Sequence, residues 1–219
     1  NQTLGPANSG EALLLLPEGG FELERINEYS TLQARVSAEG GFDSDETDNF
    51  DSAQGRGATD ERWAVLLWNI GVSHYLEPLF DLDAWRDPAT ASSSTLAHEL
   101  SFGLRGQYGF DYRLIPQAAQ VIGGLYSVRG FPQGLASGDS VAVSSLEYRF
   151  HLPRALPIRR EPLQLPWIGD FRVAPQQVYG RPDWDLVLRA FVDAGRSVQN
   201  QPDRAIGIER DQTLLSAGF

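Results

Sequence analysis

An arginine in a glycine-rich loop and an aspartate in a strand-like segment have the clearest capacity for specific chemistry. Arg129 lies in residues 123–131, which read Gly-Gly-Leu-Tyr-Ser-Val-Arg-Gly-Phe. Asp193 lies in residues 191–195, where its neighbours are apolar and a glycine follows. A guanidinium group can engage a carboxylate through two parallel hydrogen bonds. If the loop folds inward onto the strand, this pair predicts a lock that holds the loop in place.

Residues of the usual catalytic and metal-binding types form no recognisable motif. His74, His98 and His151 lie in separate segments without metal-ligand spacing. No Gly-x-Ser-x-Gly sequence occurs, and residues 123–130 lack the Lys-Ser/Thr pair of a phosphate loop. The absence of cysteine excludes disulfides, thiol chemistry and cysteine zinc sites. We therefore predict that the protein is not an enzyme and uses neither a metal nor a cofactor.

The elements that must position Arg129 and Asp193 are long strands, because apolar and polar residues alternate through five segments. The alternation covers residues 25–39, 64–76, 95–110, 141–152 and 184–196. Soluble strands average about five or six residues, whereas a tilted barrel strand needs roughly nine to eleven to cross a bilayer. Aromatic residues near the segment ends are typical of a membrane girdle: Trp63, Tyr75, Tyr108, Phe110, Tyr148, Phe150 and Trp184. The pattern favours an all-β, antiparallel transmembrane β-barrel over a soluble sheet with one wet face.

The recognisable strands are too few to close such a barrel. An open sheet edge cannot lie in lipid, so further strands are required. The chain contains no methionine, begins at Asn1 and ends within a strand-like pattern. We expect residues 1–219 to be part of one C-terminal outer-membrane barrel domain of a longer protein. The longest apolar run, residues 12–16, is too short for a membrane helix.

The segments between the strands differ in character. Residues 42–62 are acidic, but they lack the spacing and closing glutamate of a calcium loop, so we interpret them as a solvated surface loop. Residues 82–94 indicate a turn region, and residues 111–139 form the long loop that carries Arg129. Residues 153–182 are rich in proline and predicted to be irregular. The net charge of −11 argues against binding to nucleic acid.

Five short motifs follow one another in residues 120–219. They are Gly-Gly-x-x-x-Val-Arg-Gly-Phe at 123–131, Ser-Gly-Asp at 137–139, Leu-Glu-Tyr-Arg-Phe at 146–150, Phe-x-Asp-x-Gly at 191–195 and Leu-Leu-Ser-Ala-Gly at 214–218. This ordered set resembles the C-terminal barrel of the BamA/two-partner-secretion superfamily. Within this superfamily, the motifs are most similar to those of the hemolysin secretion/activation transporters of the ShlB/FhaC type, because a serine precedes Val128 and an arginine follows Gly195. The resemblance covers less than half of the chain.

This resemblance implies a sixteen-stranded barrel in the bacterial outer membrane, preceded by periplasmic POTRA domains. The implied function is two-partner secretion, in which an unfolded exoprotein passes through the barrel. The conserved loop would fold back into the lumen and its arginine would pair with the aspartate of the wall motif. The residues so implied are Val128, Arg129, Gly130 and Phe131 in the loop, and Phe191, Asp193 and Gly195 in the wall.

The alternation of the strands supports this pairing independently of the resemblance. Asp193 falls on the polar side of its segment, together with Asp185 and Arg189. Glu147 falls on the polar side of residues 141–152 and is a second candidate partner for Arg129. Gly130 would permit the loop tip to approach the wall closely.

Two other functions remain open from the sequence. The first is an assembly factor of the BamA/TamA kind, whose partners would be nascent outer-membrane proteins. The second, from another class, is a passive pore or surface-binding barrel, which would leave the Arg129 and Asp193 motifs without a role. The partners expected in every case include outer-membrane lipid and exclude nucleic acid.

Overall fold

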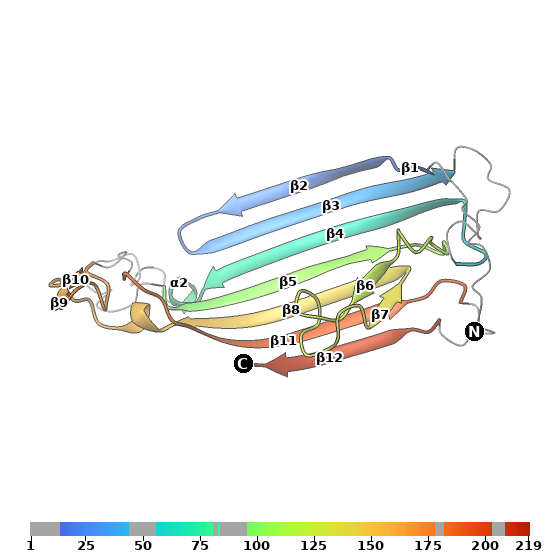
Figure 1. The fold of residues 1–219 in the computed structure, drawn as a ribbon. Helices are drawn as coiled ribbons and strands as arrows, with labels where there is room; N and C mark the ends of the chain where they lie inside the picture. The colour runs from blue at the N-terminus through green and yellow to red at the C-terminus, as the bar shows by residue number, and fades with distance from the viewer. Residues whose placement is uncertain (1–13, 44–55, 81–82, 84–95, 178–181, 203–208) are drawn as a thin grey trace, which may run out of the picture.

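The computed structural model describes residues 14–43, 56–80, 83, 96–177, 182–202 and 209–219. Its main feature is one antiparallel sheet of eight strands in the order β1-β3-β4-β5-β8-β11-β12, with β2 also paired to β3 (Figure 1). The strands are β1 (Leu14–Leu15), β2 (Glu18–Ile26), β3 (Ser30–Asp43), β4 (Arg62–Tyr75), β5 (His98–Tyr108), β8 (Ser140–His151), β11 (Val187–Val198) and β12 (Gln212–Gly218).

Helical elements in the described residues are short. They include α2 (Glu77–Phe80) and the 3-10 turn η1 (Leu152–Ala155). No helix in the described part of the chain has the length and apolar character needed to cross a membrane. The predicted all-β, antiparallel architecture is therefore confirmed at the level of the sheet.

The prediction of one continuous strand over residues 25–39 is wrong, because a hairpin turn divides this segment into β2 and β3. The Asn27 side-chain oxygen accepts hydrogen bonds from the backbone N–H of Tyr29 and of Ser30, at 3.0 and 2.7 Å. Such an Asx turn competes effectively with an extended backbone. The sheet consequently contains one long strand, β2, beyond those expected from the sequence.

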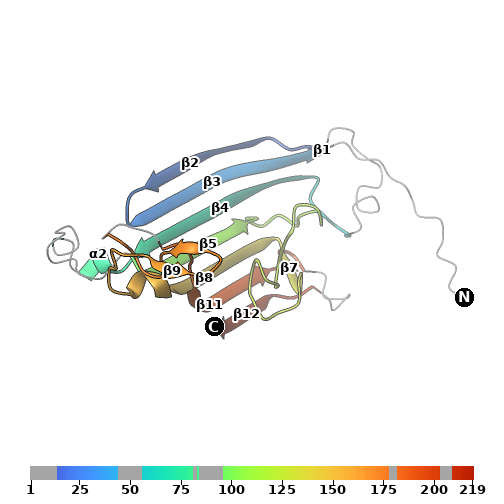
Figure 2. The ribbon, with the colours of Figure 1, turned by 60° about the vertical axis from the view of Figure 1, so that its left-hand side comes forward.

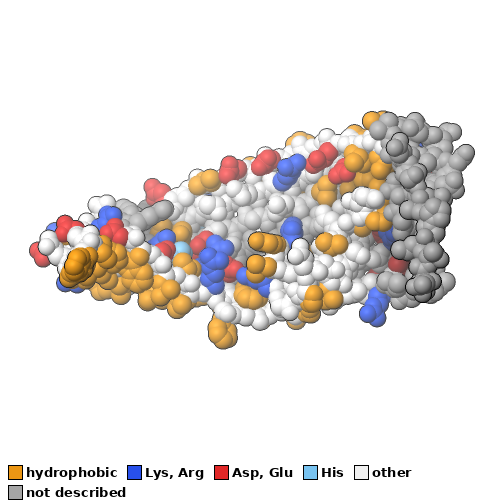
Figure 3. Space-filling view, viewed as in Figure 1, with side chains coloured by type: hydrophobic (Ala, Val, Ile, Leu, Met, Phe, Trp, Pro, Cys, Tyr) orange, Lys and Arg blue, Asp and Glu red, His pale blue; other side chains and the backbone are white. Residues whose placement is uncertain are grey.

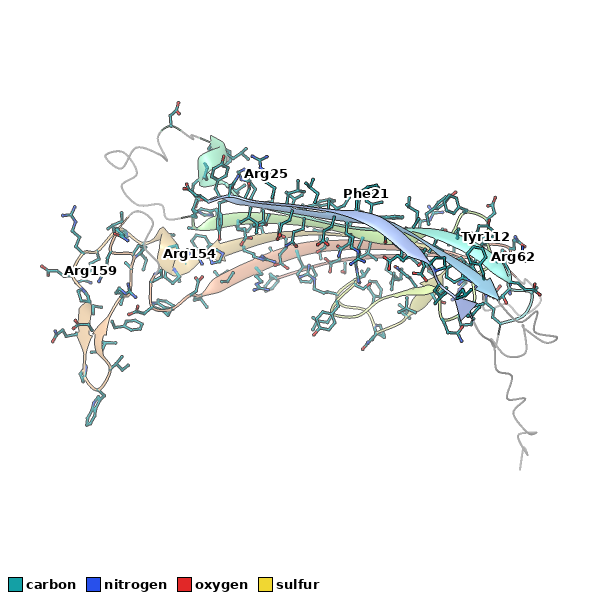
Figure 4. The ribbon with its side chains drawn as sticks, turned by 90° about the horizontal axis from the view of Figure 1, so that it is seen from above. Phe21, Arg25, Arg62, Tyr112, Arg154 and Arg159 are labelled. Carbon is teal, nitrogen blue, oxygen red and sulfur yellow. The ribbon has the colours of Figure 1, made fainter. Side chains whose placement is uncertain are left out.

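Alternation separates the sheet into two faces of opposite chemistry. The face that carries Asp193, Glu147 and Arg105 is called the polar face, and Figure 3 shows charged side chains across its strands. The other side is called the apolar face, and Figure 4 shows Phe21 on the side away from the folded-back loop. Exposed apolar residues on it include Phe21, Leu23, Val36, Leu66, Val72, Leu100, Phe102, Leu146, Leu188, Val192 and Leu215.

Charged residues of the apolar face lie near the strand ends. In the described strands they are Arg25 of β2, Arg62 of β4 and Arg196 of β11. The middle of this face is therefore uncharged and exposed, which is unusual for a sheet in water.

The buried core lies between the polar face and the loop that joins β5 to β8. The predicted loop 111–139 is not fully irregular, since β6 (Gln120–Ile122) pairs with β7 (Ala136–Gly138). One buried cluster joins loop residues to β8 and β12, and a second joins the start of the loop to β4. The clusters consist of Ile122, Val128, Ala136, Val141, Val143 and Leu214, and of Trp63, Val65, Leu114 and Ile115.

The connection from β8 to β11 lies at the opposite end of the sheet from the loop that joins β5 to β8 (Figure 1). The expectation that residues 153–182 are irregular is wrong in part, because β9 (Leu163–Leu165) and β10 (Gly169–Phe171) form a hairpin. In Figure 4 this hairpin, near the labelled Arg159, projects to the same side of the sheet as the loop. The predicted turn region 82–94 lies outside the described residues, apart from residue 83.

Candidate functional site

The loop between β5 and β8 brings Arg129 onto the sheet. It leaves β5, folds back over the polar face and returns to β8 through β7 (Figure 2). Gly123 and Gly130 have φ angles of 104° and 85°, in the left-handed region that favours glycine. At Gly130 this backbone angle, rather than a close approach, is the reason for glycine, because an added Cβ would lie 3.9 Å from the nearest side chain.

The close approach between loop and sheet occurs at Val128, just before Arg129. An ideal Cβ on Gly195 of β11 would lie 2.6 Å from Cγ2 of Val128, a distance that real side chains do not adopt. Val128 itself is fully buried, and Phe131 packs against the same cluster. The glycine of the Phe-x-Asp-x-Gly motif thus makes room for the valine of the loop motif.

Arg129 forms a fork-shaped contact with Asp193. Its Nε donates to Oδ2 and its Nη2 donates to Oδ1, each at 2.7 Å. The backbone N–H of Arg129 also donates to Oδ2, at 3.0 Å. Ser145, directly opposite Asp193 on β8, donates its hydroxyl to Oδ1 at 2.6 Å. Asp193 therefore accepts four hydrogen bonds and holds both the side chain and the backbone of the loop tip.

Glu147 and Phe191 complete the surroundings of the guanidinium group. Nη1 of Arg129 donates to Oε2 of Glu147 at 2.6 Å. The Phe191 ring lies under the cation, with its centroid 3.6 Å from Cζ. Stacking of this kind adds a cation–π attraction to the ion pairs. The structure thus brings together the loop arginine, both predicted carboxylates and the aromatic residue of the wall motif.

Burial and charge make this cluster a firm contact. The Asp193 side chain is fully buried and that of Arg129 is 20% exposed. Hydrogen bonding to Asp193 raises the pKa of Arg129, and hydrogen bonding to Glu147 adds to the rise although burial opposes it. Arg129 therefore stays charged throughout the pH range in which proteins are studied.

A ladder of ionic contacts continues from Glu147 along the polar face, and sequence reasoning missed it. Arg149 donates from Nε to Glu147 at 2.5 Å and from Nη1 to Glu99 at 3.3 Å. His151 contacts Glu99 and Asp185 at 3.4 and 2.7 Å. The only signal in the sequence was that each of these residues falls on the polar side of its alternating segment.

A second buried ionic cluster fixes the root of the loop. Asp139, the residue before β8, accepts hydrogen bonds from Nη1 and Nη2 of Arg56 at 2.6 and 3.1 Å. It also accepts the backbone N–H of Leu114 and of Asn200, at 3.0 and 2.7 Å. Burial lowers the pKa of Arg56, but hydrogen bonds to Asp139 and Glu209 outweigh it, so the pKa lies above its ordinary value. This root clasp ties three connecting segments to the sheet.

Asp139 belongs to the Ser-Gly-Asp motif noted in the sequence, but its partners could not be deduced there. Arg113, next to Leu114, binds Glu209 with two hydrogen bonds, at 2.7 and 2.9 Å. Nothing local in the sequence links Arg56, Arg113 and Glu209, because the contacts depend on how three loops fold. The acidic stretch considered for calcium falls mainly on residues 44–55, outside the described residues.

The described side chains suit binding and positioning more than reaction chemistry. They contain no cluster of His, Asp and Glu that could hold a metal ion. The carboxylates around Arg129 are engaged in ion pairs, and His151 lies between Asp185 and Glu99. The arrangement joins a loop to a sheet through charge and packing. Comparison of the chain with protein-family models, with curated proteins and with solved structures gives no match.

Proposed function

We propose that this chain forms part of the wall of an outer-membrane β-barrel that translocates protein, as in two-partner secretion. An unfolded exoprotein would pass along the polar face, which becomes the inner wall of the barrel. The observation that carries this proposal is the loop held on the polar face, where Arg129 binds Asp193 and Glu147. The opposite face of the same sheet is apolar and exposed. The motifs that resemble the BamA/two-partner-secretion superfamily supply these same residues.

The lengths and faces of the strands support insertion into a bilayer. Five strands, β3, β4, β5, β8 and β11, contain 14, 14, 11, 12 and 12 residues. About nine to eleven residues suffice for a tilted strand to cross the hydrocarbon core. A lipid-facing side that is apolar and a lumen-facing side that is polar are the pattern of transmembrane barrels. Closure would require strands beyond those described.

The conduit would work without a chemical step. The loop occupies space against the inner wall, and the Arg129 contacts keep it there. Removing one partner of a buried ion pair costs about 3–5 kcal/mol, against about 1 or less for a solvated pair. Because Asp193 is fully buried, we assign the Arg129–Asp193 pair to the buried class. The loop tip would therefore stay docked unless transport itself supplies the energy to displace it.

The test is the substitution Arg129→Ala in the intact protein in its native membrane. We expect the barrel to be inserted at normal levels while export of its exoprotein is lost, because the loop tip is no longer held by Asp193. Export is measured in the growth medium and insertion in isolated outer membranes. Normal export by this variant would refute the proposal.

Proteomics after deletion of the gene separates secretion from assembly. Loss of one or a few exported proteins, with other barrels unchanged, supports secretion. A general fall in outer-membrane barrels identifies an assembly factor of the BamA/TamA kind instead. A passive pore predicts neither change.

A further inference from the structure

The loop between β5 and β8 docks asymmetrically on the polar face. Toward β11 and β12 it packs tightly, with Val128 against Gly195 and Leu214 in the same buried cluster. Toward β3, β4 and β5 it leaves two cavities, of about 560 and 210 Å³. Asn69 and Arg105 line both cavities, so the two spaces adjoin. We call them together the loop groove.

The two sides of the loop groove differ in chemistry. The loop side presents Val121, Leu125 and Tyr126, which are 61, 72 and 87% exposed. Pockets that bind ligands are lined mainly by apolar side chains, with a few polar groups that fix the orientation of the ligand. Val121 lines the larger cavity, and Leu125 and Tyr126 line the smaller one.

The sheet side supplies hydrogen-bond donors. Asn69 and Arg105 are exposed on neighbouring strands and directly opposite each other. Arg105 donates to the backbone carbonyl of Tyr126 at 2.6 Å, which connects the sheet side to the loop rim. The floor is flat at Gly103, where an added Cβ would meet no atom within 4 Å. A ligand lying here would find amide and guanidinium donors below and apolar side chains above.

We infer that the loop groove binds an extended segment of unfolded polypeptide. The backbone of such a segment offers carbonyl oxygens to Asn69 and Arg105, and its apolar side chains cover Val121, Leu125 and Tyr126. This pairing of backbone hydrogen bonds with side-chain contacts is how extended peptides are commonly held. The inference rests on the proposed function and adds to it the side of the loop along which the exported chain passes.

The test uses the intact protein in liposomes and a short Gly/Ser-rich peptide that carries one photo-reactive benzoylphenylalanine. We expect mass spectrometry to find the peptide attached to the loop rim at Val121 and Tyr126. Asn69→Trp should lower the yield of these cross-links about tenfold, because an indole would fill the space where the two cavities adjoin. The control is Gln33→Trp, which adds the same side chain to the polar face outside both cavities and should keep the yield of the unsubstituted protein.

Cross-links found only on other surfaces would overturn the inference that the loop groove binds polypeptide. An unchanged yield of cross-links in Asn69→Trp would overturn it as well. An equal loss in Gln33→Trp would also overturn it, because the effect would then be general to the polar face. These results do not depend on the Arg129→Ala export assay, so they would reject only the binding of polypeptide in the loop groove. Normal export by Arg129→Ala rejects the proposed function whatever the peptide does.

Discussion

At the scale of single residues, the geometry around Arg129 requires a guanidinium group and not only a positive charge. Its nitrogens reach Asp193, Glu147 and Ser145 in three directions at once. A lysine carries one compact ammonium group and cannot reproduce this fork. The loop lock therefore depends on shape as well as charge.

We predict that Arg129→Lys destabilises the folded protein by about 1.5–3 kcal/mol, the contribution of a hydrogen bond to a charged group. The lysine would keep one contact to Asp193 and lose the contact to Glu147. Thermal unfolding in detergent measures the change. Arg189→Lys is the matched control: its guanidinium lies 3.9 Å from Glu147 and its side chain is 58% exposed, so it should cost less than about 1 kcal/mol. Equal losses in both variants would show that the fork has no special role.

The partners of Arg129 were predictable from the sequence, whereas those of Asp139 were not. The pairing with Asp193 was implied by the resemblance, and strand alternation supported it by placing Asp193 and Glu147 on the polar sides of their segments. The ladder through Arg149 and Glu99 needs the register between β5 and β8 as well. The root clasp needs the path of loops, since Arg56, Leu114 and Asn200 approach Asp139 from three connections. Predictability thus decreases as contacts depend more on irregular backbone.

At the scale of elements, the loop is held to β11 by packing as well as by ion pairs. Val128 occupies the space above Gly195 that any larger residue would need. We predict that Gly195→Val displaces the loop and costs about 1–3 kcal/mol, the usual penalty of overpacking. Chemical labelling of a cysteine introduced at Ser127 would report the displacement, because residues 1–219 contain no other cysteine.

Gly71→Val provides the control for this prediction. Gly71 lies in β4 on the polar face, and an added Cβ there would meet no atom within 4 Å. Valine favours extended backbone, so this variant should be neutral or slightly stabilising. If Gly71→Val exposed the loop as much as Gly195→Val, close packing against Val128 would not be what holds the loop.

The strands themselves were largely predictable, because neither a helix nor a loop produces a period of two over so many residues. β4, β5, β8 and β11 fall within or close to the alternating segments. The hairpin at Asn27 was missed although the alternation changes phase there: Leu23 and Leu32 share the apolar face, yet one has an odd and the other an even residue number. A side-chain hydrogen bond, invisible to a periodicity argument, determines where β2 ends.

At the scale of the whole molecule, the two faces of the sheet predict different responses to the same substitution. Phe102 and Ser101 are neighbours in β5 and point to opposite faces. Ser101 lies opposite Glu147, so an arginine there would gain an acidic neighbour. Phe102 lies near the middle of the uncharged apolar face and is 40% exposed. A sheet in water and a sheet in lipid would treat an arginine at residue 102 in opposite ways.

We predict that Phe102→Arg reduces folding into lipid vesicles by about 2–4 kcal/mol, the cost of arginine at the centre of a lipid-facing barrel wall. Ser101→Arg should fold nearly as well as the unsubstituted protein, since its side chain would face a wet interior. The measurement is the folded fraction in vesicles across a urea series. In a water-soluble sheet, arginine at residue 102 would instead replace an exposed phenylalanine and raise solubility. The sign of the Phe102→Arg effect therefore decides whether the apolar face contacts lipid.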